Sequence, residues 1–571
     1  MPERDPQNLN FYWATTFVRS LFEQGVRHVV ISPGSRSTPL TLAFAAHPGF
    51  EKHIIIDERS AAFTALGIGK GYGIPACLVC TSGTAVANYL PAVAEASQSG
   101  IPLIVASADR PPHQRGIGAS QTIDQIKIFG DYPVFFHEVG EPKESDKSIL
   151  RLERAAIQAF HNSTSKAGVS HLNFPFSKPF EPSSEFLEKV EKENEKHAKQ
   201  SFNSYKAKIS LTEIDEQFWS DIVSSECPVF IVGPTHPNEY LDTITELAKV
   251  LNAPILAEPG SNIPSSKYTI TGFDGFLRNI GIAESLKPDL ILRFGEEPVS
   301  KALINYILKN NDCSHIRFTA YSSLEDESLT ATKYLPLIGE LSIPEISGSA
   351  DKSWLSEWRK HQKEFKAFRE NQLHPSTPLT DGYVFLELNN LIPKKSFLMV
   401  SNSFPVRDIS LFSDYDGREI YVNRGAAGID GITSTFFGLN KSLKKAGVLF
   451  IGDIAFLHDT NALLNARTIV DTLFIVILNN GGGTIFRMLP INSYKKKYSE
   501  YFETPQNISI AALCRANKID HALISRPEQL ISNFEERLEK PGLHVLECIT
   551  DPDSSMELRH LLWDYPESDS V

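Results

Sequence analysis

Sulfur is scarce in this chain of 571 residues, which has six cysteines and four methionines. The cysteines are scattered, so they do not form the closely spaced set that marks a disulfide framework. Cys77 and Cys80 have the spacing of a redox or zinc motif, but they lie in an apolar run and no second cysteine pair accompanies them. Strand alternation would put the two thiols on different faces of a sheet. We predict that both are buried structural residues.

Long apolar runs and an excess of positive charge are also absent. No uninterrupted apolar stretch approaches the ~20 residues of a membrane-spanning helix, and the N-terminus is polar rather than signal-like. We therefore expect a cytoplasmic protein without integral membrane association. The formal net charge of −13 argues against a general nucleic-acid partner, so an anionic substrate would need a local cationic pocket.

What the chain does contain is a regular alternation of short apolar runs with amphipathic stretches. This pattern predicts an α/β protein of parallel sheets with helices on both faces. We place a first domain at residues 1–184, a charged linker or solvated helix at 185–208, a central and mainly structural domain at 209–350, and a third domain at 351–571. The first and third domains share a helix-then-strand opening, which is consistent with a duplicated fold.

The predicted strands are apolar runs of four to seven residues that end in polar turns. In the first domain they cover 26–32, 53–56, 76–81 and 103–107; in the central domain 229–232, 255–257, 290–294 and 315–319; and in the third 397–401, 419–422, 448–451, 473–478 and 544–548.

Two neighbouring strands of the third domain end in side chains suited to a divalent cation. Asp453 follows one strand, Asn480 and the glycine run 481–483 follow the next, and a crossover helix is expected at 459–470. Parallel strands end at the same edge of a sheet, so the two side chains should lie side by side. With the backbone of Gly482 they form a hard-oxygen set suited to Mg²⁺. Taken separately, each half has the pattern of a helix cap or a turn.

Polar turns at strand ends of the first domain predict a second part of the site. Arg36 follows the first strand, and Glu58 follows the second at the start of a small-residue helix. Alone, Glu58 would be interpreted as a carboxylate that answers the helix dipole. Thr81 begins a turn fit for hydrogen bonding to a cofactor or substrate, and Arg110 forms either a loop ion pair with Asp109 or a ligand contact.

Cations in the other two domains are further candidates for anion binding. Lys301, after the strand at 290–294, is the residue of the central domain best placed to reach a substrate. Arg407 and Arg424 lie in turns after successive strands of the third domain. Lone arginines usually form surface ion pairs, but two beside a cofactor site are better interpreted as clamps for carboxylates.

Together these segments resemble one family, the thiamine diphosphate-dependent 2-succinyl-5-enolpyruvyl-6-hydroxy-3-cyclohexene-1-carboxylate synthases (MenD). The resemblance covers the first and third domains nearly end to end and is weak in the middle. The family motif usually begins Gly-Asp-Gly, whereas Ile454 follows Asp453 here. The most specific segments are 32–37, 57–61, 81–88, 108–112, 401–407, 423–431 and 479–486.

The resemblance implies a fold and a cofactor site. The fold would be three doubly wound parallel-sheet domains of the thiamine diphosphate-dependent decarboxylase type, with a pyrimidine-binding (PYR) first domain and a diphosphate-binding (PP) third domain. The implied cofactors are thiamine diphosphate and Mg²⁺, with Mn²⁺ as an alternative metal. Glu58 would bond N1′ of the aminopyrimidine and promote catalysis. The other implied cofactor contacts are Thr81, Ile429 and Phe486, with Asp453, Asn480 and Gly482 as metal ligands.

The implied reaction decarboxylates 2-oxoglutarate and adds the succinyl group to isochorismate in menaquinone or phylloquinone biosynthesis. Both substrates are dicarboxylates, which accounts for several cations in an acidic protein. The implied substrate ligands are Arg36, Arg110, Gln121, Lys301, Ser403, Arg407 and Arg424. In this superfamily Glu58 of one subunit meets the metal site of another, so a homodimer or homotetramer is expected.

Two departures and two alternatives accompany this interpretation. Family members often have Asn in place of Ser120, and some have Arg in place of Ala302. A related 2-oxoacid decarboxylase or acetohydroxyacid synthase would act on monocarboxylates and have little use for Arg407 and Arg424 together. A non-catalytic thiamine-binding protein would tolerate the loss of Glu58, which is present.

Overall fold

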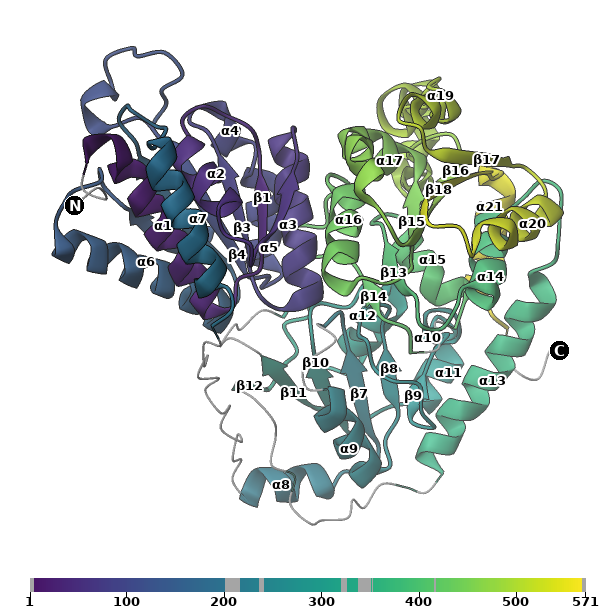
Figure 1. The fold of residues 1–571 in the computed structure, drawn as a ribbon. Helices are drawn as coiled ribbons and strands as arrows, with labels where there is room; N and C mark the ends of the chain where they lie inside the picture. Colours follow the sequence, from purple (N-terminus) through teal and green to yellow (C-terminus); the bar gives the residue numbers. More distant parts are fainter. Residues whose placement is uncertain are drawn as a thin grey trace. The chain divides into compact units, whose positions relative to one another are not determined.

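The computed structural model describes residues 5–200, 216–235, 241–319, 326–336, 343, 351, 353–414 and 417–566. These residues form three six-stranded sheets in which all paired strands are parallel, with helices packed against them (Figure 1). The α/β fold predicted from the sequence is therefore present. No helix in the described ranges is long and apolar enough to cross a membrane.

The chain divides into two compact units. Unit 1 comprises Met1–Ala207, Asn423–Lys444 and His458–Asn465, and unit 2 comprises Lys208–Val422, Lys445–Leu457 and Ala466–Val571. This division differs from the domain boundaries inferred from the sequence, which remain a prediction. The boundaries at 208, 209 and 350 lie outside the described residues.

The sheet of unit 1 has the strand order β2-β1-β3-β4-β6-β5. Its strands are β1 His28–Ile31, β2 Glu51–Ile54, β3 Ala76–Cys80, β4 Leu103–Asp109, β5 Pro133–Glu138 and β6 Val169–Pro175. The helices of this part of the chain are α1 Pro6–Gln24, α2 Thr38–Ala45, α3 Glu58–Tyr72, α4 Thr84–Ala87, α5 Leu90–Gln98, α6 Asp146–Ser165 and α7 Ser184–His197. Helices α1, α2 and α6 share a core with one face of the sheet, and α3 and α5 with the other.

Strand alternation in β3 decides the fate of the two closely spaced cysteines. Cys77 belongs to the core under α1 and α2, whereas Cys80 belongs to the core under α3 and α5. Both thiols are fully buried and free, and burial raises the pKa of each. The prediction of buried structural cysteines on different faces is confirmed.

Helix α16 (Ile432–Leu443) packs along α3 within unit 1. Gly67 of α3 and Gly438 of α16 face each other, and a Cβ on either would overlap a backbone carbonyl oxygen of the other helix. The close approach therefore depends on both glycines lacking side chains. The charged stretch after residue 184 adopts the helical alternative as α7, which buries Phe186 and Val190.

Unit 2 contains two sheets. The central sheet has the order β12-β11-β10-β7-β8-β9, and the third sheet has the order β14-β13-β15-β16-β18-β17. The central strands are β7 Pro228–Val232, β8 Ile255–Ala257, β9 Thr269–Ile270, β10 Leu290–Phe294, β11 Ser314–Thr319 and β12 Lys333–Pro336. The third-sheet strands are β13 Phe397–Val400, β14 Ile420–Tyr421, β15 Gly447–Gly452, β16 Thr472–Asn479, β17 Asp520–Ile524 and β18 Gly542–Ile549.

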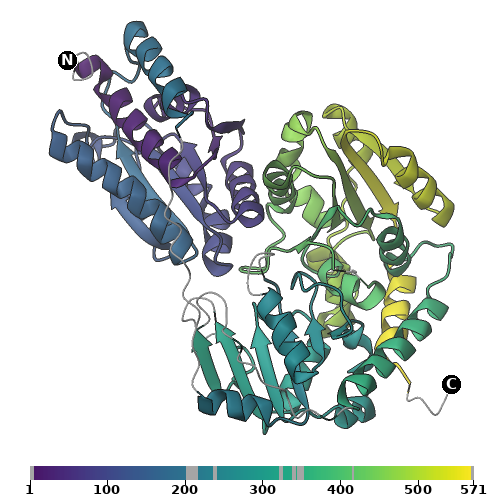
Figure 2. The same ribbon diagram turned by 60° about the horizontal axis from the view of Figure 1, so that its bottom comes forward.

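The helices of this part are α8 Glu216–Val223, α9 Leu241–Leu251, α10 Phe273–Phe276, α11 Ile280–Ser285, α12 Lys301–Lys309, α13 Trp354–Gln372, α14 Asp381–Leu391, α15 Pro405–Phe412, α17 Asp453–His458, α18 Lys496–Tyr498, α19 Ile510–Ala516, α20 Pro527–Arg537 and α21 Pro552–Trp563. One apolar core continues from the central sheet to the third and includes Ile231 and Phe450. Helix α13 contributes Trp358 and Phe365 to that core (Figure 2).

Most predicted strands coincide with observed ones, and β8 and β10 have the predicted bounds. Five strands were not predicted: β5, β6, β9, β12 and β17. Strand β6 is wholly buried yet contains His171 and Asn173, which hydrogen-bond Ser107 of β4 at 2.7 and 2.9 Å. The crossover helix predicted at 459–470 is wrong, because α17 begins at Asp453 and a 3-10 helix covers Thr460–Thr468.

Candidate active site

Unit 1 collects the predicted residues Arg36, Arg110, Thr81 and Gln121 in turns after three adjacent strands. The Arg36 side chain is 7% exposed, donates from Nη1 to the Phe176 carbonyl oxygen at 2.5 Å, and lies over the Phe180 ring. Its Nε has no hydrogen-bond partner in the described part of the chain. Burial lowers the pKa of Arg36 to about 10, and the nearby Arg110 charge lowers it further.

Arg110 is held in a network of hydrogen bonds between two loops. Its Nη1 donates to the Ser82 hydroxyl and its Nη2 to the Ser120 carbonyl oxygen, both at 2.9 Å. The Gln121 amide donates to the Ser82 carbonyl oxygen at 2.9 Å. The carboxylate of Asp109 is paired with Arg115 at 2.7 Å. The geometry leaves two guanidinium groups near each other with one shared acidic neighbour, an arrangement suited to an anion.

Glu58 is the half-buried first residue of α3. The preceding Asp57 caps the helix by accepting from the backbone N–H of Arg59 at 2.8 Å. Both neighbours of Glu58 contact the segment after α17: Asn461 donates to Asp57 at 2.5 Å, and Arg59 donates to the His458 carbonyl oxygen at 2.7 Å. The position of the Glu58 carboxylate is therefore set by a cap and by two contacts to another segment of unit 1.

The loop that carries Arg424 and Ile429 is anchored by a residue that the sequence did not single out. Glu95 of α5 is 3% exposed and accepts from the backbone N–H groups of Gly425 and Ala426 at 3.0 and 2.7 Å. A buried carboxylate with two backbone donors is a strong local anchor. Arg424 and Ile429 themselves are half-buried.

In unit 2, Asp453 is the first residue of α17 at the end of β15 and is 5% exposed. It accepts hydrogen bonds from the backbone N–H groups of Ile454 and Gly482. Burial raises the pKa of its carboxyl to about 6, and the charge of Asp381 acts in the same direction. A buried carboxyl beside a second acidic group, with only N–H donors for support, is stabilised in its ionised form by a bound cation.

Asn480 and Gly482 lie beside Asp453 because β15 and β16 pair in register, with Gly452 opposite Leu478. The Asn480 amide nitrogen donates to Asp381 at 3.4 Å, which leaves its oxygen available as a ligand. Gly482 has φ +131°, and a Cβ there would overlap the Glu503 carbonyl oxygen, so the turn requires glycine. Carboxylate, amide and backbone oxygens fit the preferences of Mg²⁺ or Mn²⁺.

A buried ion network supports this edge of the third sheet. Arg559 of α21 donates to Asp381 at 2.6 Å and, through Nε, to Asp408 at 2.8 Å. Asp381 also accepts from Thr550 at 2.6 Å, and the Arg559 guanidinium lies over the Phe404 ring. Since Asp381 also contacts Asn480, and Asp408 follows Arg407, this network joins the two predicted parts of the site in unit 2. Sequence reasoning missed it because its three members are far apart in the chain.

The remaining predicted residues of unit 2 are less enclosed. Arg407 is half-buried and donates to the Ser403 carbonyl oxygen at 2.6 Å, and Ser403 has the left-handed φ of 76°. Lys301 is exposed at the start of α12 and makes no hydrogen bond to another predicted residue within the described ranges. Phe486 is half-buried in a 3-10 helix, and Leu489 is 50% exposed.

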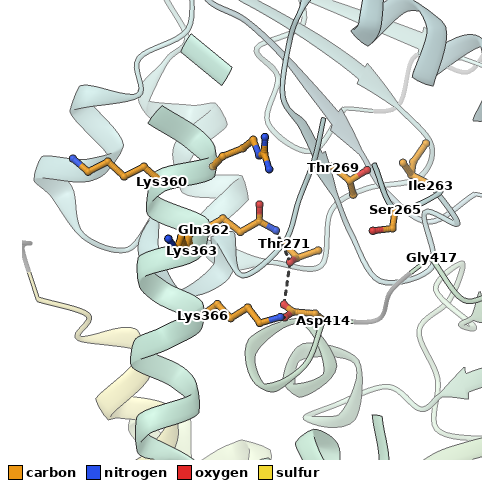
Figure 3. Close-up of a pocket in the computed structure, with 11 residues that line it drawn as sticks. Ile263, Ser265, Thr269, Thr271, Lys360, Gln362, Lys363, Lys366, Asp414 and Gly417 are labelled. Carbon is orange, nitrogen blue, oxygen red and sulfur yellow. Dashed lines mark hydrogen bonds and ion pairs between the residues drawn. The ribbon is translucent and has the colours of Figure 1, made fainter. Parts of the chain in front are cut away.

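A cavity of about 630 Å³ elsewhere in unit 2 contains none of the predicted residues (Figure 3). Its polar groups bond one another: Gln362 donates to Thr271, Thr271 donates to Asp414, and Lys366 pairs with Asp414. Lys360, on the same helix, points away from the other lining residues. We therefore assign this cavity no part in the candidate site.

Comparison with known proteins identifies related domains and full-length relatives. Residues 13–128 match the thiamine pyrophosphate enzyme N-terminal TPP binding domain, and residues 426–548 match the corresponding C-terminal TPP binding domain. The 2-succinyl-5-enolpyruvyl-6-hydroxy-3-cyclohexene-1-carboxylate synthase of Oceanobacillus iheyensis is 34% identical, over 96% of each chain. The synthases of Microcystis aeruginosa and Geobacillus kaustophilus are each 35% identical, over 96% of this chain and 97% of theirs.

Proposed function

Because the chain belongs to the family of 2-succinyl-5-enolpyruvyl-6-hydroxy-3-cyclohexene-1-carboxylate synthases, we propose that it joins the succinyl part of 2-oxoglutarate to isochorismate, with loss of CO₂. The observation that carries this proposal is the pair formed by the buried Asp453 and the adjacent Asn480 at one sheet edge. The matched thiamine pyrophosphate domains include the segments that hold Glu58 and both of these residues.

Thiamine diphosphate and a divalent cation would be held mainly by main-chain and acidic groups. Asp453, Asn480 and the backbone of Gly482 would bind Mg²⁺, or Mn²⁺ in its place, and Thr81, Ile429 and Phe486 are further candidates for contact with the cofactor. When bound, thiamine diphosphate supplies the carbanion chemistry that decarboxylation of a 2-oxoacid requires. The Glu58 carboxylate would hold a proton at the cofactor's pyrimidine ring, as a general acid–base group must.

The substrate carboxylates would be held by the cationic side chains. Arg36 and Arg110 are close enough to lower the pKa of Arg36, so a bound carboxylate would relieve their repulsion. Arg407, Arg424 and Lys301 would bind further carboxylate oxygens. The polar side chains Ser403 and Gln121 would orient the substrates.

The oligomeric state and domain roles belong to the same proposal. We infer a homodimer or homotetramer with active sites between subunits, located in the cytoplasm. Residues 1–184 would form the PYR domain, 209–350 a mainly structural central domain, and 351–571 the PP domain. Sedimentation of the purified protein measures the assembly directly, and a monomer that is fully active would contradict shared sites.

The decisive experiment measures CO₂ release by the purified protein with Mg²⁺ and thiamine diphosphate. The donor is 2-oxoglutarate or pyruvate, each with and without isochorismate. We expect formation of a new adduct, seen by mass spectrometry, only with 2-oxoglutarate and isochorismate together. Pyruvate turnover that ignores isochorismate would favour a related 2-oxoacid decarboxylase or acetohydroxyacid synthase and would overturn the assignment of the arginines.

A further inference from the structure

Two histidines and one glutamate converge at the edge of the sheet in unit 1. Edge strand β2 pairs with β1 so that His28 lies opposite Glu51 and Val30 lies opposite His53. Side chains alternate along a strand, so Glu51 and His53 share a face, and His28 faces the same way. The cluster lies at the amino ends of these strands, whereas Arg36 and Glu58 follow their carboxyl ends.

The distances between the three side chains match those of a metal site. His28 Nδ1 lies 3.1 Å from His53 Nε2 and 3.9 Å from Glu51 Oε2. One ligand atom from each residue lies within 4.8 Å of the others, the only such cluster of three found in the described ranges. Ligands at ~2.0–2.1 Å from a tetrahedral ion are ~3.3 Å apart. The two nitrogens already have this spacing, and the carboxylate needs a shift of only ~0.5 Å.

The protonation states favour metal binding. Burial lowers the pKa of His28, and burial together with the neighbouring His28 lowers the pKa of His53 to about 3. Both rings are therefore neutral at neutral pH, the form that ligates metals. Burial opposes ionisation of Glu51, but its hydrogen bond to Lys444 brings the pKa of the carboxyl below its usual value.

Two lysines and a tyrosine border the cluster. Lys444 donates to Glu51 Oε1 at 2.5 Å, which leaves Oε2 for a metal. Lys441 acts electrostatically on His53, and the Tyr72 ring lies 6.0 Å from the His28 ring. The lysine charges oppose a divalent cation, so affinity should be lower than for the same ligands without them.

A second histidine pair in unit 1 provides a natural contrast. His197 contacts His47 through Nδ1 at 3.1 Å and Glu23 through Nε2 at 3.0 Å. Its two partners therefore lie on opposite sides of one ring and cannot share an ion with it. Convergence is a property of the His28 cluster and not of histidine pairs in general.

We propose that His28, Glu51 and His53 bind one Zn²⁺ ion, with water completing its coordination. Imidazole nitrogens suit Zn²⁺, whereas Mg²⁺ prefers oxygen ligands, so this site would be chemically distinct from the one at Asp453. The ion would join edge strand β2 to β1 and stabilise unit 1. Without metal, the same atoms form a hydrogen bond between the rings and the ion pair of Glu51 with Lys444.

The test uses the metal-free full-length protein in excess Mg²⁺ and thiamine diphosphate, which occupy the Asp453 site. Zn²⁺ binding is followed by calorimetry, and Co²⁺ absorption reports nitrogen ligands. We expect one Zn²⁺ per wild-type chain and a Zn²⁺-dependent rise in Tm. His28→Ala and Glu51→Ala should each weaken binding more than about tenfold, the smaller loss seen when supporting residues are removed. Glu51 is exposed, so its variant should fold even if the His28 variant does not.

The matched control is His197→Ala, which removes an imidazole from the non-convergent pair. It should bind Zn²⁺ as the wild type does. Equal Zn²⁺ binding by the wild type and Glu51→Ala would overturn the proposal, as would an equal loss in His197→Ala. Neither readout requires the proposed enzymatic activity, so this test can fail without affecting that proposal.

Discussion

The sheet of unit 1 and the third sheet have the same strand order but opposite charge at their carboxyl edges. In both, the second strand in sequence lies on one side of the first and the third strand on the other. Unit 1 places Arg36 and Arg110 at this edge, and the pKa of Arg36 falls to about 10 through burial and the neighbouring cation. The third sheet places Asp453 there, and burial raises the pKa of its carboxyl to about 6.

This difference shows what the shared fold supplies and what the turns supply. Parallel strands bring their terminal turns to one edge, and the order creates a point where neighbouring connections diverge. The residues in those turns then decide the sign of the charge. Each edge holds like charges in a buried setting, so each is stabilised by a ligand of opposite sign. The edge in unit 1 suits carboxylates, and the edge in unit 2 suits a divalent cation.

The largest effect should come from removing the acidic centre of unit 2. Asp453→Ala should abolish Mg²⁺-dependent binding of thiamine diphosphate, because the buried carboxylate supplies the negative charge of the proposed metal site. Calorimetric titration with cofactor and Mg²⁺ measures this. Glu58→Gln, in unit 1, is the matched control and should retain binding. Undiminished cofactor binding by Asp453→Ala would show that the cation site has been misplaced.

Glu58→Gln should instead lose catalysis. A positioned general acid–base group contributes ~10²–10⁴ in rate, so we expect a loss of that order in CO₂ release. Exchange of the cofactor C2 proton, measured by NMR, should slow with it. Asp57→Asn alters the adjacent helix cap and serves as the control for structural damage. If Glu58→Gln exchanges this proton at the wild-type rate, Glu58 does not have the proposed role.

Arg559→Met should destabilise unit 2 by about 3–5 kcal/mol, because it leaves Asp381 and Asp408 buried without their cation. Urea unfolding measures the loss. Adding Asp381→Asn and Asp408→Asn to the same variant should recover much of the stability, since no uncompensated charge remains. A fully stable Arg559→Met protein would mean that the two carboxyls are protonated in the folded state.

Asp459 tests whether a raised pKa alone marks a cation site. It is fully buried in unit 1, accepts from the Ser434 backbone N–H at 2.7 Å, and burial raises its pKa to about 6 from 3.8. Because the folded state favours the protonated form, its stabilising contribution is present below pH 4 and is lost as pH rises through 6.

Asp459→Asn imitates the protonated form and should remove this pH dependence. The stability of the variant relative to wild type should increase by about 3 kcal/mol between pH 4 and pH 8, measured by urea unfolding at each pH. Mg²⁺ should not change the difference, in contrast to its expected effect at Asp453. A difference that stays constant with pH would show that Asp459 ionises normally.

The smallest effect concerns the anchor of the Arg424 loop. Glu95→Gln keeps the size of the side chain but replaces one acceptor oxygen with a donor, so one of the two backbone N–H groups loses its partner. We expect a loss of about 1–3 kcal/mol in stability and a higher KM for substrate with cofactor affinity unchanged. Glu23→Gln, a partly exposed glutamate of unit 1, is the control. Equal losses in both variants would remove the special role of Glu95.

Local patterns predicted much of the site before any coordinates. Asp453 and Asn480 each follow an apolar run of strand length, so their proximity follows from the parallel pairing of β15 and β16. Cys77 and Cys80 separate to different faces because they are an odd number of positions apart in one strand. Strand β6 escaped prediction because its polar side chains find hydrogen-bond partners only on a neighbouring strand.

The sequence by itself determined the α/β class, the strand ends and the identity of the charged residues at them, because these depend on short-range periodicity and turn chemistry. Only the tertiary structure decided which distant groups hold those residues in place. Glu95 meets the Arg424 loop across 330 positions, and Arg559 meets Asp381 across 178. The same holds for His28, Glu51 and His53, which converge only through the register of β1 and β2. Such pairings depend on packing and strand register, which no local pattern encodes.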